Sequence, residues 1–340
     1  MKQRGFFDET DRLQELTKLG DPLEKLNRMI KWESFRHSLT KVFQKEAKGP
    51  GGRPPYDYVV MFKILILQRL YGISDAQAEY QIKDRLSFMR FLGFQLCDRV
   101  PDEKTIWLYR EKLVQADIID TLFYRFTKQL EDNGLITRSG TIVDASFIDT
   151  PKQRNSKDEN DAIKKGSLPE DWNAADKKNM VAQKDLDARW TKKNNEVHYG
   201  YKNHVKADAD SKLITDYAVT SAEVHDSQML ETLIDKKKDK VLFADSAYKG
   251  DGIESCLGDT IDNQICEKGY RNKPLTEEQK KNNKKKSKIR ARVEHIFGFM
   301  TNTMKGMFIR CIGLKRASFA VGMMNLVYNM CRFIFLSKAS

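Results

Sequence analysis

Two short apolar runs that each end in aspartate constrain the fold of this chain more than any other feature of its sequence. Residues 139–144 read Ser-Gly-Thr-Ile-Val-Asp and residues 240–245 read Lys-Val-Leu-Phe-Ala-Asp, so both indicate strands that end in a carboxylate. If the two strands are neighbours in one sheet, Asp144 and Asp245 emerge at the same edge, where ligands collect in α/β folds. A single aspartate after an apolar run is more often a turn or cap residue, so only the pair favours a site.

The rest of the second half of the chain predicts a mixed α/β layer fold, because strand signals come first and then alternate with helix signals. We expect a polar, lysine-rich insertion or mobile loop at residues 151–193, where apolar positions are few. The further predicted elements are strands at 198–207, 213–220 and 263–267 and helices near 226–233 and 289–304.

The first part of the chain predicts an all-α domain of several short helices. Gly and Pro interrupt the pattern at residues 49–55, Ser74 with Gln77 forms a capping box, and Asp102 is expected to cap a further helix. This pattern suits a domain with a helix-turn-helix, and an ordinary helical bundle with no role in DNA binding fits it equally well. We place a helical domain at residues 1–120 and a catalytic domain at 121–340.

A third acid follows on a predicted helix. Val293, Ile296 and Phe297 lie on one face of this helix, and Glu294 borders that face. Three carboxylates are oxygen ligands that suit Mg²⁺ or Mn²⁺. Two such ions roughly 3.5–4 Å apart can support phosphoryl transfer. Without further support, a solvated helix glutamate would be the default for Glu294.

The charge of the chain favours a polyanionic partner. Lys and Arg total 60 against 48 Asp and Glu, a net charge of +12, and nucleic acid is the commonest such partner. A basic tract without acids lies directly before the helix of Glu294. It contains Lys280, Lys281, Lys284, Lys285, Lys286, Lys288, Arg290 and Arg292. A tract that contacts phosphates is favoured here over a merely solvated face.

Other features point to a reducing compartment. The five cysteines are scattered and form no Cys-x-x-Cys pair, so a disulfide framework and a structural zinc site are not expected. The first residues contain no apolar run that could serve as a secretory signal. The apolar stretch 317–336 is interrupted by Asn325, Asn329 and Arg332, which favours a buried helix over a membrane span.

The sequence resembles the bacterial insertion-sequence transposases of the DDE class, family five, over nearly its whole length. The blocks that carry the resemblance are Arg53–Tyr58, Leu65–Gln68, Gly72–Asp75, Val100–Asp102 with Thr105 and Arg110, Val143–Ser146, Asp187–Lys193, His198–Lys202, Val219–Thr220, Val224–Ser227, Ala244–Tyr248, and Arg290, Glu294 and Phe297–Gly298.

The resemblance implies a ribonuclease H-like core, with Asp144, Asp245 and Glu294 as metal-binding catalytic acids. It also implies Mg²⁺, with Mn²⁺ able to substitute, and double-stranded DNA as partner, both terminal inverted repeats and target. We expect a cytoplasmic homodimer on paired ends and no membrane partner. Ser287 and Thr301 depart from the family's tyrosine and lysine, so the lysine's DNA contact is assigned to Lys305 instead.

Further DNA contacts are expected from Lys104 and Arg110, at the start of the helix capped by Asp102, and from Arg290, Arg292 and Lys284, Lys285, Lys286 and Lys288. Trp172 and Trp190 could stack on unpaired bases or pack the insertion onto the core. His198 and His204 are expected to be ordinary polar residues on one face of a strand. A nuclease of the same fold that never joins strands, and a non-catalytic DNA-binding regulator, are the alternative functions.

Overall fold

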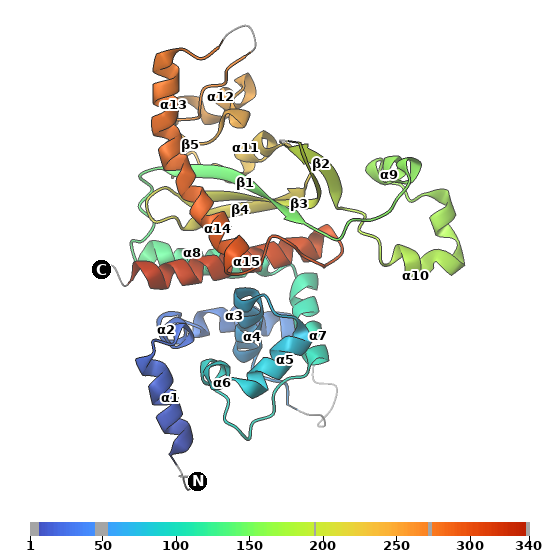
Figure 1. Ribbon diagram of the computed structural model, residues 1–340, viewed down its shortest axis with the longest axis vertical. Helices are drawn as coiled ribbons and strands as arrows, with labels where there is room; N and C mark the ends of the chain where they lie inside the picture. Colours follow the sequence, from blue (N-terminus) through green and yellow to red (C-terminus); the bar gives the residue numbers. More distant parts are fainter. Residues whose placement is uncertain (1–6, 45–53, 194, 271–273, 338–340) are drawn as a thin grey trace. The chain divides into compact units, whose positions relative to one another are not determined.

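The fold is given by a computed structural model, which describes residues 7–44, 54–193, 195–270 and 274–337 (Figure 1). The chain divides into two compact units. The helical unit comprises Met1–Leu135, Asn302–Lys305 and Gly322–Ser340, and the sheet unit comprises Ile136–Thr301 and Gly306–Val321.

The helical unit is built around a helix that is buried on nearly every side. This helix, α4, has eight buried residues, and it begins where the Asp57 carboxylate accepts the backbone N–H groups of Val59 and Val60. It ends at Gly72, whose left-handed backbone (φ +61°) few other residues adopt. The helices of this unit before residue 136 are α1 (Asp8–Lys18), α2 (Pro22–Met29), α3 (Glu33–Phe43), α4 (Tyr58–Tyr71), α5 (Asp75–Asp84), α6 (Leu86–Leu92), α7 (Glu103–Gln115) and α8 (Ile119–Asp132).

The start signals predicted for two of these helices are confirmed. Ser74 and Gln77 form a reciprocal capping box at the start of α5. The Asp102 carboxylate accepts the Thr105 N–H at 2.7 Å at the start of α7. These caps satisfy backbone donors that have no partner within the helix, so local sequence determines where α5 and α7 begin.

The unit boundary differs from the one expected near residue 120. Helix α8 belongs to the helical unit because its apolar face is buried there, and the ring of Phe126 meets that of Phe333 edge-on at 6.1 Å. Phe333 lies in the C-terminal part of α15 (Leu314–Leu336), which therefore also belongs to the helical unit. A contact between residues 207 positions apart cannot be read from local pattern.

Helix α15 is the apolar stretch near the C-terminus. Within the described part of the chain it alone is long and apolar enough to cross a membrane. Its most apolar window is 67% buried inside the protein, and Asn325 and Asn329 are fully buried. Composition of this kind is shared by core helices of globular proteins.

The sheet unit contains a six-stranded mixed sheet in the order β2-β3-β1-β5-β6, with β4 paired to β3. Strand β1 runs antiparallel to β3 and parallel to β5, and β5 runs parallel to β6. The strands are β1 (Thr141–Asp149), β2 (Arg189–Lys193), β3 (Glu196–Asp208), β4 (Ile214–Ser221), β5 (Val241–Phe243) and β6 (Asp262–Asn263). The mixed α/β layer fold predicted for this part of the chain is confirmed.

Helices and 3₁₀ turns surround and extend this sheet. Helix α13 is a lysine-rich helix that the 3₁₀ turn η6 separates from α14, so the expected single helix over 289–304 is interrupted. The elements are α9 (Lys157–Lys164), η1 (Glu170–Asn173), η2 (Ala175–Lys177), α10 (Lys178–Val181), η3 (Asp226–Met229), α11 (Leu230–Leu233), η4 (Ser246–Tyr248), α12 (Asp251–Leu257), η5 (Gly258–Thr260), α13 (Glu277–Arg290), η6 (Ala291–Val293) and α14 (Glu294–Asn302).

The insertion at 151–193 is a small folded lobe that ends in a strand of the sheet. In Figure 1, α9 and α10 stand apart from the strands. Trp172 is 4% exposed and its indole N–H donates to Glu159, which joins two parts of the lobe. The last residues of the insertion form β2, paired with β3 from Arg189 to Lys193. The expectation for these residues was an insertion or a mobile loop, because the apolar residues that hold the lobe are few, and the structure shows the first of the two.

Candidate active site

The parallel pairing of β1 with β5 brings Asp144 and Asp245 together, but the expectation that both end a strand is wrong for Asp144. Strand β1 continues past it to Asp149, because β3 pairs with β1 along that whole length. Thr141 pairs with Leu242 and Ile142 with Phe243, so the same register continued by two residues places Asp144 opposite Asp245. Asp245 follows β5 directly and caps η4, where its carboxylate accepts the Ala247 N–H at 2.8 Å. We call Asp144 and Asp245 the acid edge.

The Asp144 side chain is only 13% exposed, and each of its carboxylate oxygens has a partner. One oxygen accepts the Ala145 N–H at 2.9 Å, and the other accepts the Arg290 guanidinium at 2.9 Å. Burial raises the pKa of the Asp144 carboxyl, and the neighbouring Asp245 charge adds to this, while the Ala145 amide and Arg290 oppose it. Two carboxylates therefore lie close enough to repel each other, an arrangement that a cation would relieve.

The third predicted acid lies outside this pair. Glu294 is the first residue of α14 and is exposed, whereas Val293, Ile296 and Met300 form the buried side of the same segment. The turn η6 lies between Arg290 and Glu294, so the two do not follow one continuous α-helical face. Among the residues that the structure describes, no group of three or more His, Cys, Asp or Glu side chains is arranged to hold a metal ion.

The donor set of the acid edge nevertheless fits a hard divalent cation. Asp144 and Asp245 offer carboxylate oxygens, the ligand type that Mg²⁺ and Mn²⁺ take in proteins. Arg290 supplies a positive charge beside Asp144, 2.9 Å from one of its carboxylate oxygens. Asp144 and Asp245 therefore lie next to each other, whereas Glu294, the third residue expected as a ligand, is exposed at the start of α14.

Helix α13 presents two faces of different character. The inner face contacts the segment after β6 through Asn283, whose side chain exchanges two hydrogen bonds with the backbone of Glu267, and through Lys286, which donates to the Ile265 carbonyl at 3.0 Å. The same face continues to Arg290 and so reaches Asp144. The basic tract is consequently a helix anchored to the sheet unit, and not a loose loop.

The outer face of α13 carries lysines that point away from these contacts. They are spaced by three, four and seven residues, so they follow one side of the helix. The outer face consists of the exposed residues Lys281, Lys284, Lys285 and Lys288. Lys280, in contrast, forms a surface ion pair with Glu277 at 2.8 Å.

Two predicted DNA contacts are bound to the protein instead of being free for a phosphate. Lys286 is half-buried against the Ile265 carbonyl, and Arg292 donates to the Ala209 carbonyl and to Asp210. Both anchor α13 and η6 to neighbouring segments. Lys305 is exposed and adopts a left-handed backbone (φ +49°) in the turn after α14.

A buried ion pair supports the loop beside the acid edge. Lys202 on β3 is 8% exposed and donates to Asp226 at 2.8 Å and to the Val224 carbonyl at 2.7 Å. Lys193 on β2 reaches the same carboxylate at 3.5 Å. The one sequence signal for this ion pair was a lysine inside the strand expected at 198–207, because a lysine buried in a strand requires an acid partner. Neither its partner nor its purpose could be read from the sequence.

The two histidines of β3 have separate environments. His204 is fully buried, its Nε2 lies 2.8 Å from the Thr220 hydroxyl, and burial lowers its pKa to about 4. His198 stacks on Phe147 and lies 3.3 Å from Asp149. They act as ordinary polar residues of the strand, as the sequence suggests.

The tryptophans of the insertion also differ. Trp172 packs within the lobe, whereas Trp190 is 37% exposed and lines a cavity of about 500 Å³. Tyr199, Arg189, Asn155 and Lys164 contribute to the same cavity. Packing therefore accounts for Trp172, and only Trp190 offers an accessible ring.

In the helical unit, the start of α7 carries mixed charge. Arg110 donates two hydrogen bonds to the Asp75 carboxylate, at 2.6 and 2.7 Å, so its guanidinium joins α7 to α5 and is not free for a base contact. Lys104 is exposed, and Trp107 is 46% exposed.

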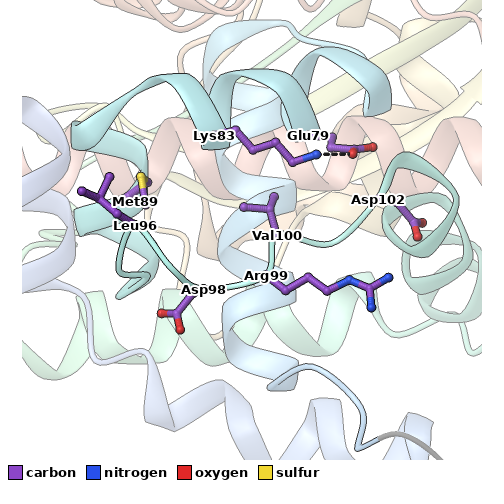
Figure 2. A pocket seen from close by; sticks show the side chains of 8 residues that line it. All are labelled: Glu79, Lys83, Met89, Leu96, Asp98, Arg99, Val100 and Asp102. Carbon is purple, nitrogen blue, oxygen red and sulfur yellow. Dashed lines mark hydrogen bonds and ion pairs between the residues drawn. The ribbon is translucent and has the colours of Figure 1, made fainter.

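A groove of about 350 Å³ lies next to this helix start. Figure 2 shows the Glu79–Lys83 pair on one side of it and Arg99 and Asp102 on the other. Glu79 also accepts the Glu103 N–H at 2.9 Å. Three acids line the groove against two bases, so its charge does not favour a polyanion.

Comparison with known proteins identifies the family. A model described as "Transposase domain (DUF772)" matches residues 11–112, and a model described as "Transposase DDE domain" matches residues 136–330. Among solved structures, a piggyBac transposase synaptic complex with hairpin DNA aligns at 12% identity with a TM-score of 0.46, covering 94% of this chain and 75% of that one. The family match spans more than half of the chain and contains the whole acid edge, so the chain belongs to the transposase DDE domain family, as an insertion-sequence DDE transposase with a ribonuclease H-like core.

Proposed function

We propose that this transposase binds the terminal inverted repeats of its element, hydrolyses a DNA strand at each end, and joins the new 3′-hydroxyls to target DNA. The observation that carries the proposal is the parallel pairing of β1 with β5, whose register brings Asp144 beside Asp245, with Arg290 at the end of a basic helix bound to Asp144. Enzymes use carboxylates to hold divalent ions, and cationic side chains to stabilise the transferring group, in phosphoryl transfer.

The acid edge would hold Mg²⁺ through Asp144 and Asp245, with Glu294 as the third ligand and Mn²⁺ as a substitute. Bound divalent ions would supply an activated oxygen nucleophile and charge stabilisation for the leaving oxygen. Arg290 would orient the scissile phosphate, since a planar guanidinium binds two phosphate oxygens at once. Ala145 and Ala247 hold the two aspartates in place through their backbone N–H groups.

DNA would reach the acid edge along the outer face of α13. Lys281, Lys284, Lys285 and Lys288 contact no acid in the described structure and lead along the helix toward Arg290. Such lysines attract DNA regardless of its sequence, because binding releases counterions from the phosphates. Lys104 and Lys305, both exposed, are further candidates for phosphate contacts. Action as a cytoplasmic homodimer on paired ends completes the proposal.

A strand-transfer assay with candidate end DNA, a target plasmid and Mg²⁺ tests this function. Joined product that depends on both Asp144 and Asp245 would support it. Hydrolysis without joining, under conditions where paired ends form, would instead indicate a nuclease. Binding without either reaction would indicate a non-catalytic regulator. Either of the last two results would overturn the proposed transposition activity.

A further inference from the structure

The cavity of about 500 Å³ beside Trp190, which we call the lobe pocket, is lined by the sheet on one side and by the insertion lobe on the other. The sheet contributes Trp190 on β2 and Tyr199 on β3, which are paired across the two strands with their ring centroids 4.7 Å apart. The lobe contributes α9 and residues before it, including the side chains of Asn155 and Asn160. Sites for small ligands measure about 300–1,000 Å³, so the lobe pocket can hold one ring system.

The two aromatic rings of the lobe pocket differ in accessibility. Trp190 is 37% exposed and Tyr199 only 3%, so Trp190 is the ring that a ligand can reach. The ammonium group of Lys152 lies 5.9 Å from the centroid of the Trp190 ring. Nucleobases stack on accessible aromatic rings of this kind whatever their identity, because every base has a π face.

The charge that the lobe pocket offers to a ligand is mainly positive. Lys157 and Lys164 are exposed at the two ends of α9, and neither pairs with an acid in the described part of the chain. Two acids also line the pocket, but Asp185 is 4% exposed and already accepts the Tyr201 hydroxyl, which leaves Asp161. An accessible aromatic ring next to free cations suits a nucleotide, which combines a flat base with a phosphate.

The strand register shows which face of the sheet carries the lobe pocket. The hydroxyls of Tyr199 and Tyr201 both reach Asp185, one at its backbone carbonyl and the other at its carboxylate, so these two residues of β3 point to one face. Trp190 is paired with Tyr199 and therefore points to the same face. Alternation along β3 continues from Tyr201 to Val205, which also points there.

The acid edge lies on this face too, at a definite separation from the lobe pocket. Asp144 is paired with Val205, whereas Trp190 is paired with Tyr199, six residues earlier on β3. Six residues of a strand span about 20 Å. A paired DNA strand advances about 3.4 Å per nucleotide, so this separation corresponds to about six nucleotides.

We propose that the lobe pocket takes up one unpaired base of the element's end, stacked on Trp190, while Lys157 and Lys164 bind the adjoining phosphates. The inference rests on the proposed function, because it requires end DNA as the ligand. The side-chain amides of Asn155 and Asn160 offer donors and acceptors to the edge of the base. A base held there fixes the register of the strand, so that the scissile phosphate arrives at the acid edge.

A mismatch scan of the end DNA tests this uptake. The affinity of the full-length chain is measured without divalent ions, so that no strand is cut, on end duplexes that each carry one mismatched pair. A mismatched base leaves the duplex at lower cost. At one position, about six nucleotides from the scissile phosphate, a mismatch should therefore raise the affinity of the wild type by about 10-fold. Trp190→Ala should show no such rise.

An abasic nucleotide at the same position separates uptake of the base from mere flexibility of the duplex. The wild type should bind the abasic duplex about 10-fold more weakly than the mismatched one, because no ring is left to stack on Trp190. Trp190→Ala should bind the two duplexes equally. Equal binding of both duplexes by the wild type would show that the lobe pocket does not hold the base.

Trp190→Phe and Met180→Ala are the matched controls. Phenylalanine keeps a ring for stacking, so Trp190→Phe should retain most of the rise in affinity. Met180 is an apolar residue of the same lobe with a similar exposure of 38%, and it lies outside the lining of the lobe pocket. Met180→Ala should therefore respond to the mismatch as the wild type does, whereas a general loosening of the lobe would affect both alanine variants alike.

An equal rise in affinity for the wild type and Trp190→Ala, or the lack of any position at which a mismatch raises affinity, would overturn the inference. Strand transfer distinguishes this failure from failure of the proposed function. If the wild type joins end DNA to the target while the mismatch scan is flat, only the role of the lobe pocket fails. If the wild type does not prefer end DNA to an unrelated duplex, the proposed function fails and the uptake of an end base fails with it.

Discussion

The acid edge and the outer face of α13 differ in how the protein holds their charges. Asp144 is 13% exposed and bound by Arg290 and a backbone amide, so its position is fixed. The four lysines of the outer face are exposed, and their charge acts through solvent. A charge held by protein partners can orient a reacting group, whereas solvated charges provide a diffuse, salt-dependent attraction. The acid edge is therefore suited to chemistry and the outer face to capture of DNA.

Asp245→Asn should produce the largest effect, and on chemistry alone. Losing several kcal/mol of charge stabilisation, about 4, corresponds to a loss of about 10³-fold in the single-turnover cleavage rate. Asparagine caps a turn as well as aspartate does, so η4 and the fold should persist. DNA affinity, measured by filter binding, should stay within about twofold because the outer face is untouched. Cleavage at the wild-type rate by this variant would show that Asp245 does not take part in the chemistry.

Arg290→Ala should lower the saturated cleavage rate by about 10–100-fold, because a phosphate displaced by about 1 Å reacts that much more slowly. Arg290→Lys is the matched control, since it keeps the charge and loses the two-point geometry. If orientation is what Arg290 provides, the lysine variant should recover DNA affinity but only part of the rate. If Arg290→Lys cleaves at the full wild-type rate, Arg290 contributes only its positive charge, as the lysines of the outer face do, and does not orient the phosphate.

Replacing Lys281, Lys284, Lys285 and Lys288 together by alanine should act on binding. Removing four phosphate contacts would reduce the slope of log affinity against log salt by about 3–4. The saturated cleavage rate should change little, because Arg290 and the acid edge are retained. Unchanged salt slopes would show that DNA does not follow the outer face, whatever the fate of cleavage.

The smallest and sharpest contrast compares neighbouring lysines. Lys285→Ala should reduce the salt slope by about 0.9, since Lys285 is exposed on the outer face. Lys286→Ala should leave the slope unchanged, because Lys286 already donates to the Ile265 carbonyl. Equal salt slopes for the two variants would mean that the inner and outer faces of α13 contribute equally to DNA binding.

Local sequence predicts what local physics determines. The strand that precedes Asp245, the capping box of Ser74 and the cap at Asp102 follow from an apolar run and from side-chain acceptors within a few residues. The continuation of β1 beyond Asp144 to Asp149 depends on its pairing with β3, which the run at 139–144 does not indicate. The position of the insertion follows from its composition, and its polar residues still fold because Trp172 and a few apolar neighbours make a lobe. The assignment of α8 to the helical unit could not be predicted locally, because it depends on a contact with Phe333, which lies far along the chain.

The candidate site shows the same limit more sharply. Lys285 and Lys286 are identical and adjacent, and only the Ile265 carbonyl, which contacts α13 in the fold, separates their roles. Arg110 has the sequence context of a DNA contact, yet Asp75 from another helix binds it. Tyr248 lies in a stretch of sequence that resembles the family, but only the structure shows that its hydroxyl has no hydrogen-bond partner among the described residues. Whether a charged side chain is available to bind DNA is therefore decided by partners that are distant in the sequence.

A metal-specificity switch at the acid edge tests the central claim most directly. Cysteine at position 245 or 294 replaces a hard oxygen ligand by a softer thiolate, which Mg²⁺ accepts poorly and Mn²⁺ tolerates better. The single-turnover cleavage rate of end DNA is measured for Asp245→Cys and Glu294→Cys with each ion. Both variants should be inactive with Mg²⁺ and regain cleavage with Mn²⁺, while the wild type cuts with both. Cleavage by either variant at the wild-type rate in Mg²⁺ would contradict its assignment as a metal ligand.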